Sequence, residues 1–233
     1  MEPTEGLGLF VRPKFLIGIT GFAGAGKDSV RSILEADHGF EGKAFADAVR
    51  KFAEESNMLL YDPAFVSQSD LNFQEGKARY KDIVSEYGYE TAKRQFPCVR
   101  AHLVSIGHGA RESISPTVWV DKILPLIPVS MRDIPCYKNL EIPRESLCIS
   151  DTRYHEGEEE RIRLMGGIIF LVTRPEVVAA NETEGKSIPL IEPDFILRND
   201  GTLEELRATV RRALELHQMS HDGHWHPPRG IVV

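Results

Sequence analysis

The chain has 233 residues, of which 42% are hydrophobic and 27% are charged. These values are typical of a globular protein with one α/β domain, or with one domain and a small inserted lobe. The formal net charge of −7 argues against a general nucleic-acid binder, because such proteins need a basic face to displace counterions from the phosphates.

The sequence also favours a protein that stays in the cytoplasm. Its three cysteines, Cys98, Cys136 and Cys148, match no zinc-binding spacing and are interpreted as reduced thiols. Residues 1–13 hold no long apolar run, so we expect no signal peptide, and no stretch approaches the length of a membrane span. We therefore expect no membrane partner.

The chain opens with a strand, a glycine-rich turn and a helix. Residues 14–20 (KFLIGIT) form a short apolar run that predicts a buried strand, and residues 27–37 carry apolar side chains at helical spacing. Residues 43–46 predict a second short strand. Asp47 then has the character of an N-cap, which predicts a helix through about Asn57.

The middle of the chain differs in composition from the parts on either side. Residues 61–115 are polar and aromatic, without a strong strand signal, and predict a mostly helical insert. Within it, Pro97 suits the first turn of a helix that we expect to stop at Gly107. Residues 117–127 predict another helical piece.

Three further strands are expected after the insert. They cover residues 146–150, 168–173 and 194–198, and a charged helix is expected at 156–165 between the first two. A polar loop over 174–190 and a final helix over 202–218 complete the pattern. We interpret the tail, 219–233, as poorly ordered. Its neighbourhood holds four histidines that we assign to solvent rather than to a metal: His217, His221, His224 and His226.

Strands separated by helices predict an α/β fold with a five-stranded parallel sheet flanked by helices. We expect one domain over residues 1–233. Its parts are a core (14–60 and 116–218), a helical insert (about 61–115) that would bind an acceptor, a lid loop (about 174–190) and a flexible tail (219–233). Ligands bind such sheets at the carboxyl ends of the strands, where the glycine turn, Asp151 and Arg174 are all expected.

The glycine turn fits the pattern G-x-x-x-x-G-K, from Gly21 to Lys27. Glycines let the backbone curl around a phosphate so that its N–H groups point inward, and the following helix adds its positive end. Lys27 would reach the β- and γ-phosphates of a nucleoside triphosphate. The residues expected to bind ATP are Ala23, Gly24, Ala25, Gly26, Lys27, Asp28 and Ser29.

The position after the lysine usually carries the hydroxyl that binds magnesium, but here it is Asp28, followed by Ser29. A carboxylate is a good magnesium ligand, so Asp28 would bind the metal directly or through water, or Ser29 would take that role. The alternative is that Asp28 only caps the helix. The N-K-x-D and D-x-x-G strings of GTPases do not occur in the chain, which leaves the small P-loop kinases as the expected class.

Several charged residues are candidates for binding the phosphate of an acceptor. Guanidinium groups match phosphate oxygens, and Arg153 follows a strand end, while Arg100 and Arg111 flank one predicted helix of the insert. Asp151 follows a buried strand and either orients the acceptor or caps a helix, and Asp47 has the same two interpretations. Arg174 would stabilise charge on the transferring group from the lid. Trp119, taken alone, is interpreted as a core residue.

Four groups of residues carry a family resemblance. They are Gly24-Ala25-Gly26-Lys27-Asp28-Ser29 in the glycine turn, Phe45-Ala46-Asp47 after the second strand, Ile106-Gly107-His108 with Arg111 and Trp119-Val120 in the insert, and Asp151-Thr152-Arg153-Tyr154-His155-Glu156 after the third strand. Together, in this order, they resemble the deoxynucleoside monophosphate kinases of tailed bacteriophages, from about Phe15 to Leu216.

The resemblance implies a P-loop kinase fold, with ATP and Mg²⁺ as cofactors and a deoxynucleoside monophosphate (dNMP) as acceptor. For a phage-encoded enzyme it implies the host cell cytoplasm. The resemblance favours a role for Trp119 in lining the acceptor site. The acceptor contacts that it implies are Arg100, Gly107, His108, Trp119, Asp151, Arg153 and Glu156. His108 departs from the threonine expected after the glycine. The segment Asn181-Glu182-Thr183-Glu184 is a weak match to the family's polar lid.

Three functions are therefore weighed. Lys27, Asp151 and Arg174 would be catalytic residues of a dNMP kinase that transfers the γ-phosphoryl group of ATP. The alternatives are another small P-loop kinase, such as a dephospho-coenzyme A kinase, and a nucleotide-dependent switch without an acceptor. The expected partners are small molecules and not nucleic acid or membrane, and a homodimer is left open.

Overall fold

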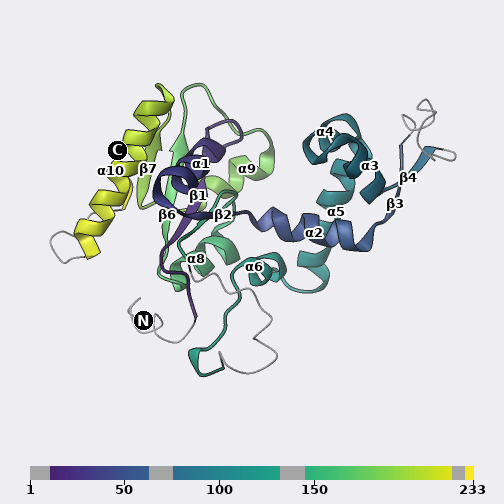
Figure 1. Ribbon diagram of the computed structural model, residues 1–233, viewed down its shortest axis with the longest axis horizontal. Coiled ribbons are helices and arrows are strands. Elements are labelled where there is room, and N and C mark those ends of the chain that lie inside the picture. The colour runs from purple at the N-terminus through teal and green to yellow at the C-terminus, as the bar shows by residue number, and fades with distance from the viewer. Residues whose placement is uncertain (1–10, 63–75, 132–144, 222–228) are drawn as a thin grey trace. The chain divides into compact units, whose positions relative to one another are not determined.

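The computed structural model describes residues 11–62, 76–131, 145–221 and 229–233, and it divides the chain into two compact units. Unit 1 comprises residues 1–45 and 120–233, and unit 2 comprises residues 46–119. Figure 1 labels the elements of both units, which are described separately here.

A six-stranded sheet forms the centre of unit 1, and each neighbouring pair of its strands is parallel. The strands in spatial order are β2 (Glu41–Lys43), β5 (Leu147–Ile149), β1 (Leu16–Thr20), β6 (Ile168–Thr173), β7 (Phe195–Arg198) and β8 (Ile231–Val232). The predicted α/β class and parallel sheet are confirmed.

The prediction of five strands is wrong, because β8 adds a sixth. It lies in the tail that we had interpreted as poorly ordered, and it pairs with β7 so that Ile231 lies opposite Phe195. Ile231 and Val233 pack against the core next to β7, which explains why these residues are ordered. Of the four histidines, His217 stacks on Phe15 with ring centroids 4.9 Å apart, and His224 and His226 lie outside the described residues.

Helices cover both faces of the sheet, and the alternation of side chains along the strands explains why. Ile17 and Ile19 of β1 belong to one apolar cluster with residues of α1 (Lys27–His38) and α10 (Leu203–His221). Leu16, from the same strand, belongs to a second cluster with residues of α6 (Val118–Ile123) and α8 (Glu160–Leu164). A strand that is buried on both faces has apolar residues at successive positions. This pattern in the sequence allowed β1 to be predicted.

Unit 2 is mostly helical, as expected for the insert. Its helices are α2 (Phe45–Ser56), α3 (Tyr80–Tyr87), α4 (Tyr89–Gln95) and α5 (Pro97–Ser113), and it also holds the hairpin of β3 (Leu59–Tyr61) and β4 (Lys77–Arg79). A cluster of buried side chains joins the helices, among them Tyr80, Ile83, Phe96 and Val99. The two short strands of this hairpin were not predicted, because residues 61–115 carry no strong strand signal.

Several predicted boundaries were wrong. The second strand ends at Lys43 and α2 begins at Phe45, so Asp47 lies in the first turn of α2 and is not its N-cap. Helix α5 does not stop at Gly107 but continues to Ser113. The helix predicted at 156–165 is broken, because Glu156 and Gly157 have non-helical dihedral angles. A kinked segment, η4 (His155–Glu159), therefore precedes α8.

Short helical pieces complete unit 1. They are η3 (Val129–Met131), α9 (Glu182–Ser187) and η5 (Ile188–Leu190). The last two lie within the segment predicted as a lid. None of the helices among the described residues is long and apolar enough to cross a membrane.

Candidate active site

The glycine loop lies at the carboxyl end of β1 and runs directly into α1. Two of its glycines are required by the backbone. Gly21 has a φ of 138°, and a Cβ there would come within 2.4 Å of the carbonyl oxygen of Val172. Gly26, the N-cap of α1, has a φ of 106°, and a Cβ there would come within 2.2 Å of the side-chain nitrogen of Asn199. The loop can therefore fold tightly only with glycine at these positions.

Lys27, the first residue of α1, turns back over this loop. Its Nζ donates hydrogen bonds to the carbonyl oxygens of Gly21 at 2.7 Å and Phe22 at 2.9 Å. Burial and the positive charge of Arg153 lower the pKa of Lys27, whereas Glu184, Asp28 and Asp151 act in the opposite direction. The ammonium group therefore lies in a region where charges from several elements meet.

Asp151 and Arg153 reach this region from the carboxyl end of β5, the strand next to β1. The Oδ1 of Asp151 accepts a hydrogen bond of 2.7 Å from the backbone N–H of Phe45, the first residue of α2. Asp151 thus satisfies one orphan donor at the start of α2, a helix far away in the sequence. It is not the N-cap of the helical segment that follows it, because Tyr154 takes that position. Arg153 is exposed, and its charge acts on Lys27. The structure brings Lys27, Asp151 and Arg153 together.

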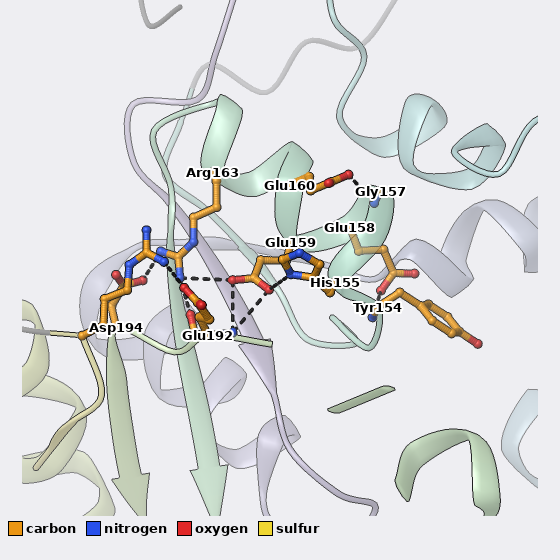
Figure 2. A network of polar contacts seen from close by, with 10 residues as sticks. Tyr154, His155, Gly157, Glu158, Glu159, Glu160, Arg163, Glu192 and Asp194 are labelled. Atoms are coloured by element: carbon orange, nitrogen blue, oxygen red, sulfur yellow. Dashed lines mark hydrogen bonds and ion pairs between the residues drawn. The ribbon is translucent and has the colours of Figure 1, made fainter. Parts of the chain in front are cut away.

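Two buried glutamates fix the segment that carries Arg153 (Figure 2). The carboxylate of Glu158 accepts hydrogen bonds from the backbone N–H groups of Arg153 at 2.7 Å and Tyr154 at 3.2 Å. The sequence pattern predicted a charged helix over 156–165 and did not indicate a role for Glu158. A buried carboxylate costs free energy unless it is paired, and here the two N–H groups offset that cost.

Glu159 forms the centre of the second part of this network (Figure 2). It accepts hydrogen bonds from Arg163 at 3.3 Å and from the backbone N–H of Glu192 at 3.2 Å, and it pairs with Nδ1 of His155 at 2.8 Å. Arg163 also donates to Asp194 and to the carbonyl oxygen of Glu192. These bonds link the segment after β5 to the residues that lead into β7.

Arg174 is exposed and lies directly after β6, where it lines a hollow of about 440 Å³. The hollow is lined mainly by apolar side chains, including Val177 and Ile188 from the lid segment, and by Phe22 and Ala25 from the glycine loop. The lid segment and the glycine loop therefore border the same hollow.

Two residues that sequence analysis did not assign hold the glycine loop. The Nδ2 of Asn199 donates a hydrogen bond of 2.8 Å to the carbonyl oxygen of Ala25. Glu184 of α9, buried to 5% exposure, accepts a hydrogen bond of 3.3 Å from the backbone N–H of Ala23. Asn199 follows a parallel strand, which is a signal that could have identified it, whereas nothing in the local sequence places Glu184 beside the loop.

Asp28 and Ser29 lie in the first turn of α1, with Asp28 exposed and Ser29 half-buried. Because Gly26 is the N-cap of this helix, Asp28 does not take the capping position. A carboxylate and a hydroxyl directly after Lys27 are hard oxygen donors, and magnesium on a phosphate usually keeps waters and takes one or two protein ligands. This donor set fits magnesium. Among the described residues no group of three or more histidine, cysteine or carboxylate side chains could hold a metal.

Unit 2 carries all but one of the remaining predicted acceptor residues, and four of them lie on α5. Arg100 and His108 are exposed, and Gly107 and Arg111 are half-buried. Trp119 is 3% exposed and donates from Nε1 to the carbonyl oxygen of Gly107 at 3.0 Å. Trp119 is therefore packed, in agreement with its interpretation from the sequence alone.

Asp47 pairs with Arg50, one turn further along α2, and the guanidinium of Arg50 lies 4.6 Å from the ring centroid of Tyr89. Lys93 lies 5.5 Å from the same centroid. Of this cluster, only Asp47 was indicated by the sequence. The spacing of Asp47 and Arg50 is that of an ion pair on a helix, so the pair could have been predicted. Glu156, the last predicted site residue, is exposed in η4 of unit 1.

A parallel sheet whose central strand runs through a glycine loop into a helix, with lysine at the start of that helix, is the arrangement of P-loop phosphotransferases. Sequence similarity to a viral protein supports the same class, a small P-loop kinase.

The chain is 27% identical over 209 residues to a protein of Acanthamoeba polyphaga mimivirus named "Putative deoxynucleotide monophosphate kinase", with 84% of this chain and 93% of that protein covered. Among solved structures, a dephospho-CoA kinase from Campylobacter jejuni is 15% identical with a TM-score of 0.42, covering 90% of this chain and 98% of that one. No protein-family model matches the chain. This relative is a giant-virus protein, and the resemblance to the enzymes of tailed bacteriophages stays a prediction.

Proposed function

We propose that this protein is a deoxynucleoside monophosphate kinase, which transfers the γ-phosphoryl group of ATP to a dNMP and produces ADP and a dNDP. The observation that carries the proposal is that Lys27 turns back over a glycine loop whose backbone suits phosphate, while Arg153 follows the neighbouring parallel strand at the same edge of the sheet. The name of the mimivirus relative supports the choice of acceptor.

On the donor side, the glycine loop would hold the β- and γ-phosphates. Lys27 would exchange its two carbonyl partners for phosphate oxygens and neutralise charge as the phosphoryl group moves. The apolar hollow that borders the loop suits the flat base of a nucleotide. Arg174, on the rim of this hollow, would add positive charge when the lid segment covers the site.

Asp28 and Ser29 would hold magnesium through their side-chain oxygens. When bound, the metal would neutralise negative charge on the phosphates.

On the acceptor side, Arg153 would bind the phosphate of the dNMP, and Asp151 would orient the attacking phosphate oxygen. Glu158 keeps the Arg153 segment in place through its two backbone hydrogen bonds. Further acceptor contacts, including Glu156 of unit 1, follow from the resemblance stated above. Those proposed in unit 2, which includes the predicted insert at about 61–115, are Asp47, Arg100, Gly107, His108, Arg111 and Trp119.

The test is to measure ADP production from ATP with each common dNMP, each NMP and dephospho-CoA. We expect stimulation by at least one dNMP and loss of at least two orders of magnitude in the Lys27→Met variant, because transition-state charge would be left uncompensated. Stimulation by dephospho-CoA alone would identify another small P-loop kinase. ATP hydrolysis that no acceptor changes would instead indicate a switch protein.

A further inference from the structure

Glu184 connects the lid segment to the glycine loop. It lies in α9, and its Oε2 accepts hydrogen bonds from the backbone N–H of Ala23 in the loop at 3.3 Å and of Ala180 at 3.2 Å. The side chain is 5% exposed, so one buried carboxylate satisfies donors from two segments far apart in the sequence. An N–H in a phosphate-binding loop is thus occupied by an anion from the protein itself.

Helix capping explains only part of this arrangement. The side chain of Asn181 accepts a hydrogen bond of 2.9 Å from the backbone N–H of Glu184, and Glu184 reaches back to Ala180, much as in a capping box. A glutamate that served only the cap could remain in solvent, as Glu182 does in the same helix. Glu184 is buried against Ala23 instead, so its position has to be explained by the loop as well.

The charge of Glu184 also acts on the site. Its carboxylate opposes the lowering of the Lys27 pKa by burial and Arg153, which places it within electrostatic reach of the ammonium group. A nucleotide in the loop would bring several negative charges to the same place. In a half-buried region such repulsion is screened less than at the surface.

We propose that Glu184 is an electrostatic latch between the lid and the phosphate-binding loop. Its carboxylate holds α9 against Ala23 until phosphate enters the loop, and the negative charge of the phosphate then weakens this bond and frees α9 to rearrange. The proposal rests on the proposed function in one respect, since it requires that the loop bind the phosphates of a nucleotide.

The experiment compares the full-length protein with Glu184→Gln in direct titrations with ADP and with inorganic pyrophosphate. Glutamine keeps the shape and can still accept from Ala23, but it carries no charge. We expect Glu184→Gln to bind both ligands roughly three- to five-fold more tightly, the size of one partly screened charge interaction. Added salt should reduce the difference.

Two control variants separate the latch from simpler explanations. Glu182→Gln removes a charge from an exposed position of the same helix and should leave both affinities within error. Asn181→Ala removes the helix cap but keeps the carboxylate, so tightening of equal size in this variant would mean that a loosened helix, not the charge, is responsible. Thermal melts establish that each variant is folded.

Hydrogen exchange of residues 177–187 gives a second readout. Pyrophosphate should speed exchange of this segment in the wild-type protein, because the bonds to Glu184 are weakened, and should have less effect in Glu184→Gln. Unchanged or weaker binding by Glu184→Gln overturns the latch and leaves the proposed function standing. Failure of the wild-type protein to bind either ligand overturns both.

Discussion

Lys27 and Arg153 hold two positive charges near one loop, and the lowered pKa of Lys27 reflects both burial and this repulsion. An anion between them would relieve the repulsion, which is the physical reason to expect phosphate there. The sequence could indicate both residues, because each follows a predicted strand that ends at the same edge of the sheet. It could not indicate Glu158 or Glu184, whose burial depends on contacts made only in the folded chain.

Replacing Arg153 with alanine should depress kcat/KM for the dNMP by about 2 kcal/mol or more of transition-state binding, since a charge-assisted hydrogen bond to phosphate would be lost. The affinity for ATP should change much less. Steady-state kinetics with each substrate varied in turn measures both effects. Arg212→Ala is the matched control, because Arg212 is exposed on α10, where it pairs with Glu215. Equal losses for ATP and dNMP would assign Arg153 a structural role.

His155 should make stability depend on pH. Its hydrogen bond to the carboxylate of Glu159 raises its pKa, and the charges of Glu159, Glu160 and Glu192 act in the same direction. Because the folded pKa lies above the unfolded value of about 6.5, this stabilisation is complete below that pH and is lost as the pH rises through the folded pKa. Urea unfolding between pH 5 and 9 should show this extra stability in the wild type and not in His155→Gln. Parallel curves for the two proteins would contradict the prediction.

Helix α5 shows how far sequence patterns describe an element. Pro97 predicted its first turn correctly, but Gly107 was wrongly taken as its end. Glycine usually terminates a helix by adopting a positive φ, yet Gly107 has none and stays helical. A Cβ built on Gly107 meets no atom within 4 Å, so packing does not require glycine there. Glycine weakens a helix, and packing does not require it at this position. A close approach of the acceptor to the backbone of Gly107 would explain why the residue is glycine.

Gly107→Ala should therefore raise the free energy of unfolding by about 0.5–1 kcal/mol, because alanine favours the helix. If a substrate approaches this backbone closely, the same variant should raise KM for the dNMP. Denaturation and kinetics on one preparation measure the two effects. Gly109→Ala provides the control, since Gly109 also has open space but lies on a different side of α5. An unchanged KM for Gly107→Ala would argue against the contact.

Four strands, β1, β5, β6 and β7, could be predicted because each is a short apolar run bounded by polar or glycine residues. The prediction for β2 was displaced, since Glu41–Lys43 is not an apolar run and the strand predicted at 43–46 overlaps it only at Lys43. The hairpin could not be predicted, since in β3 only Leu60 is buried between exposed Leu59 and Tyr61. In β8 the signal is shorter still, with two residues paired to β7. Such strands are defined by their neighbours, so a local pattern carries little information about them.

In unit 1, β8 is the edge strand next to β7. Ile231 packs against the core while Val232 is 59% exposed, as alternation along a strand requires. Ile231→Ala should lower the free energy of unfolding by about 1–2 kcal/mol, because part of a core contact is removed. Val232→Ala should change it by less than about 0.5 kcal/mol. Equal effects in chemical denaturation would mean that β8 does not contribute to the fold in solution.

The order of strands also has a consequence for how the protein is made. β1 lies between β5 and β6, and residues 21–146 separate it from the nearer of these strands in the sequence. While the ribosome synthesises this stretch, the apolar β1 has neither of its neighbours available, and all of unit 2 is synthesised before β5. The nascent chain should therefore display an unpaired apolar strand for seconds, at elongation rates of about 5–20 residues per second, a state in which chaperones bind.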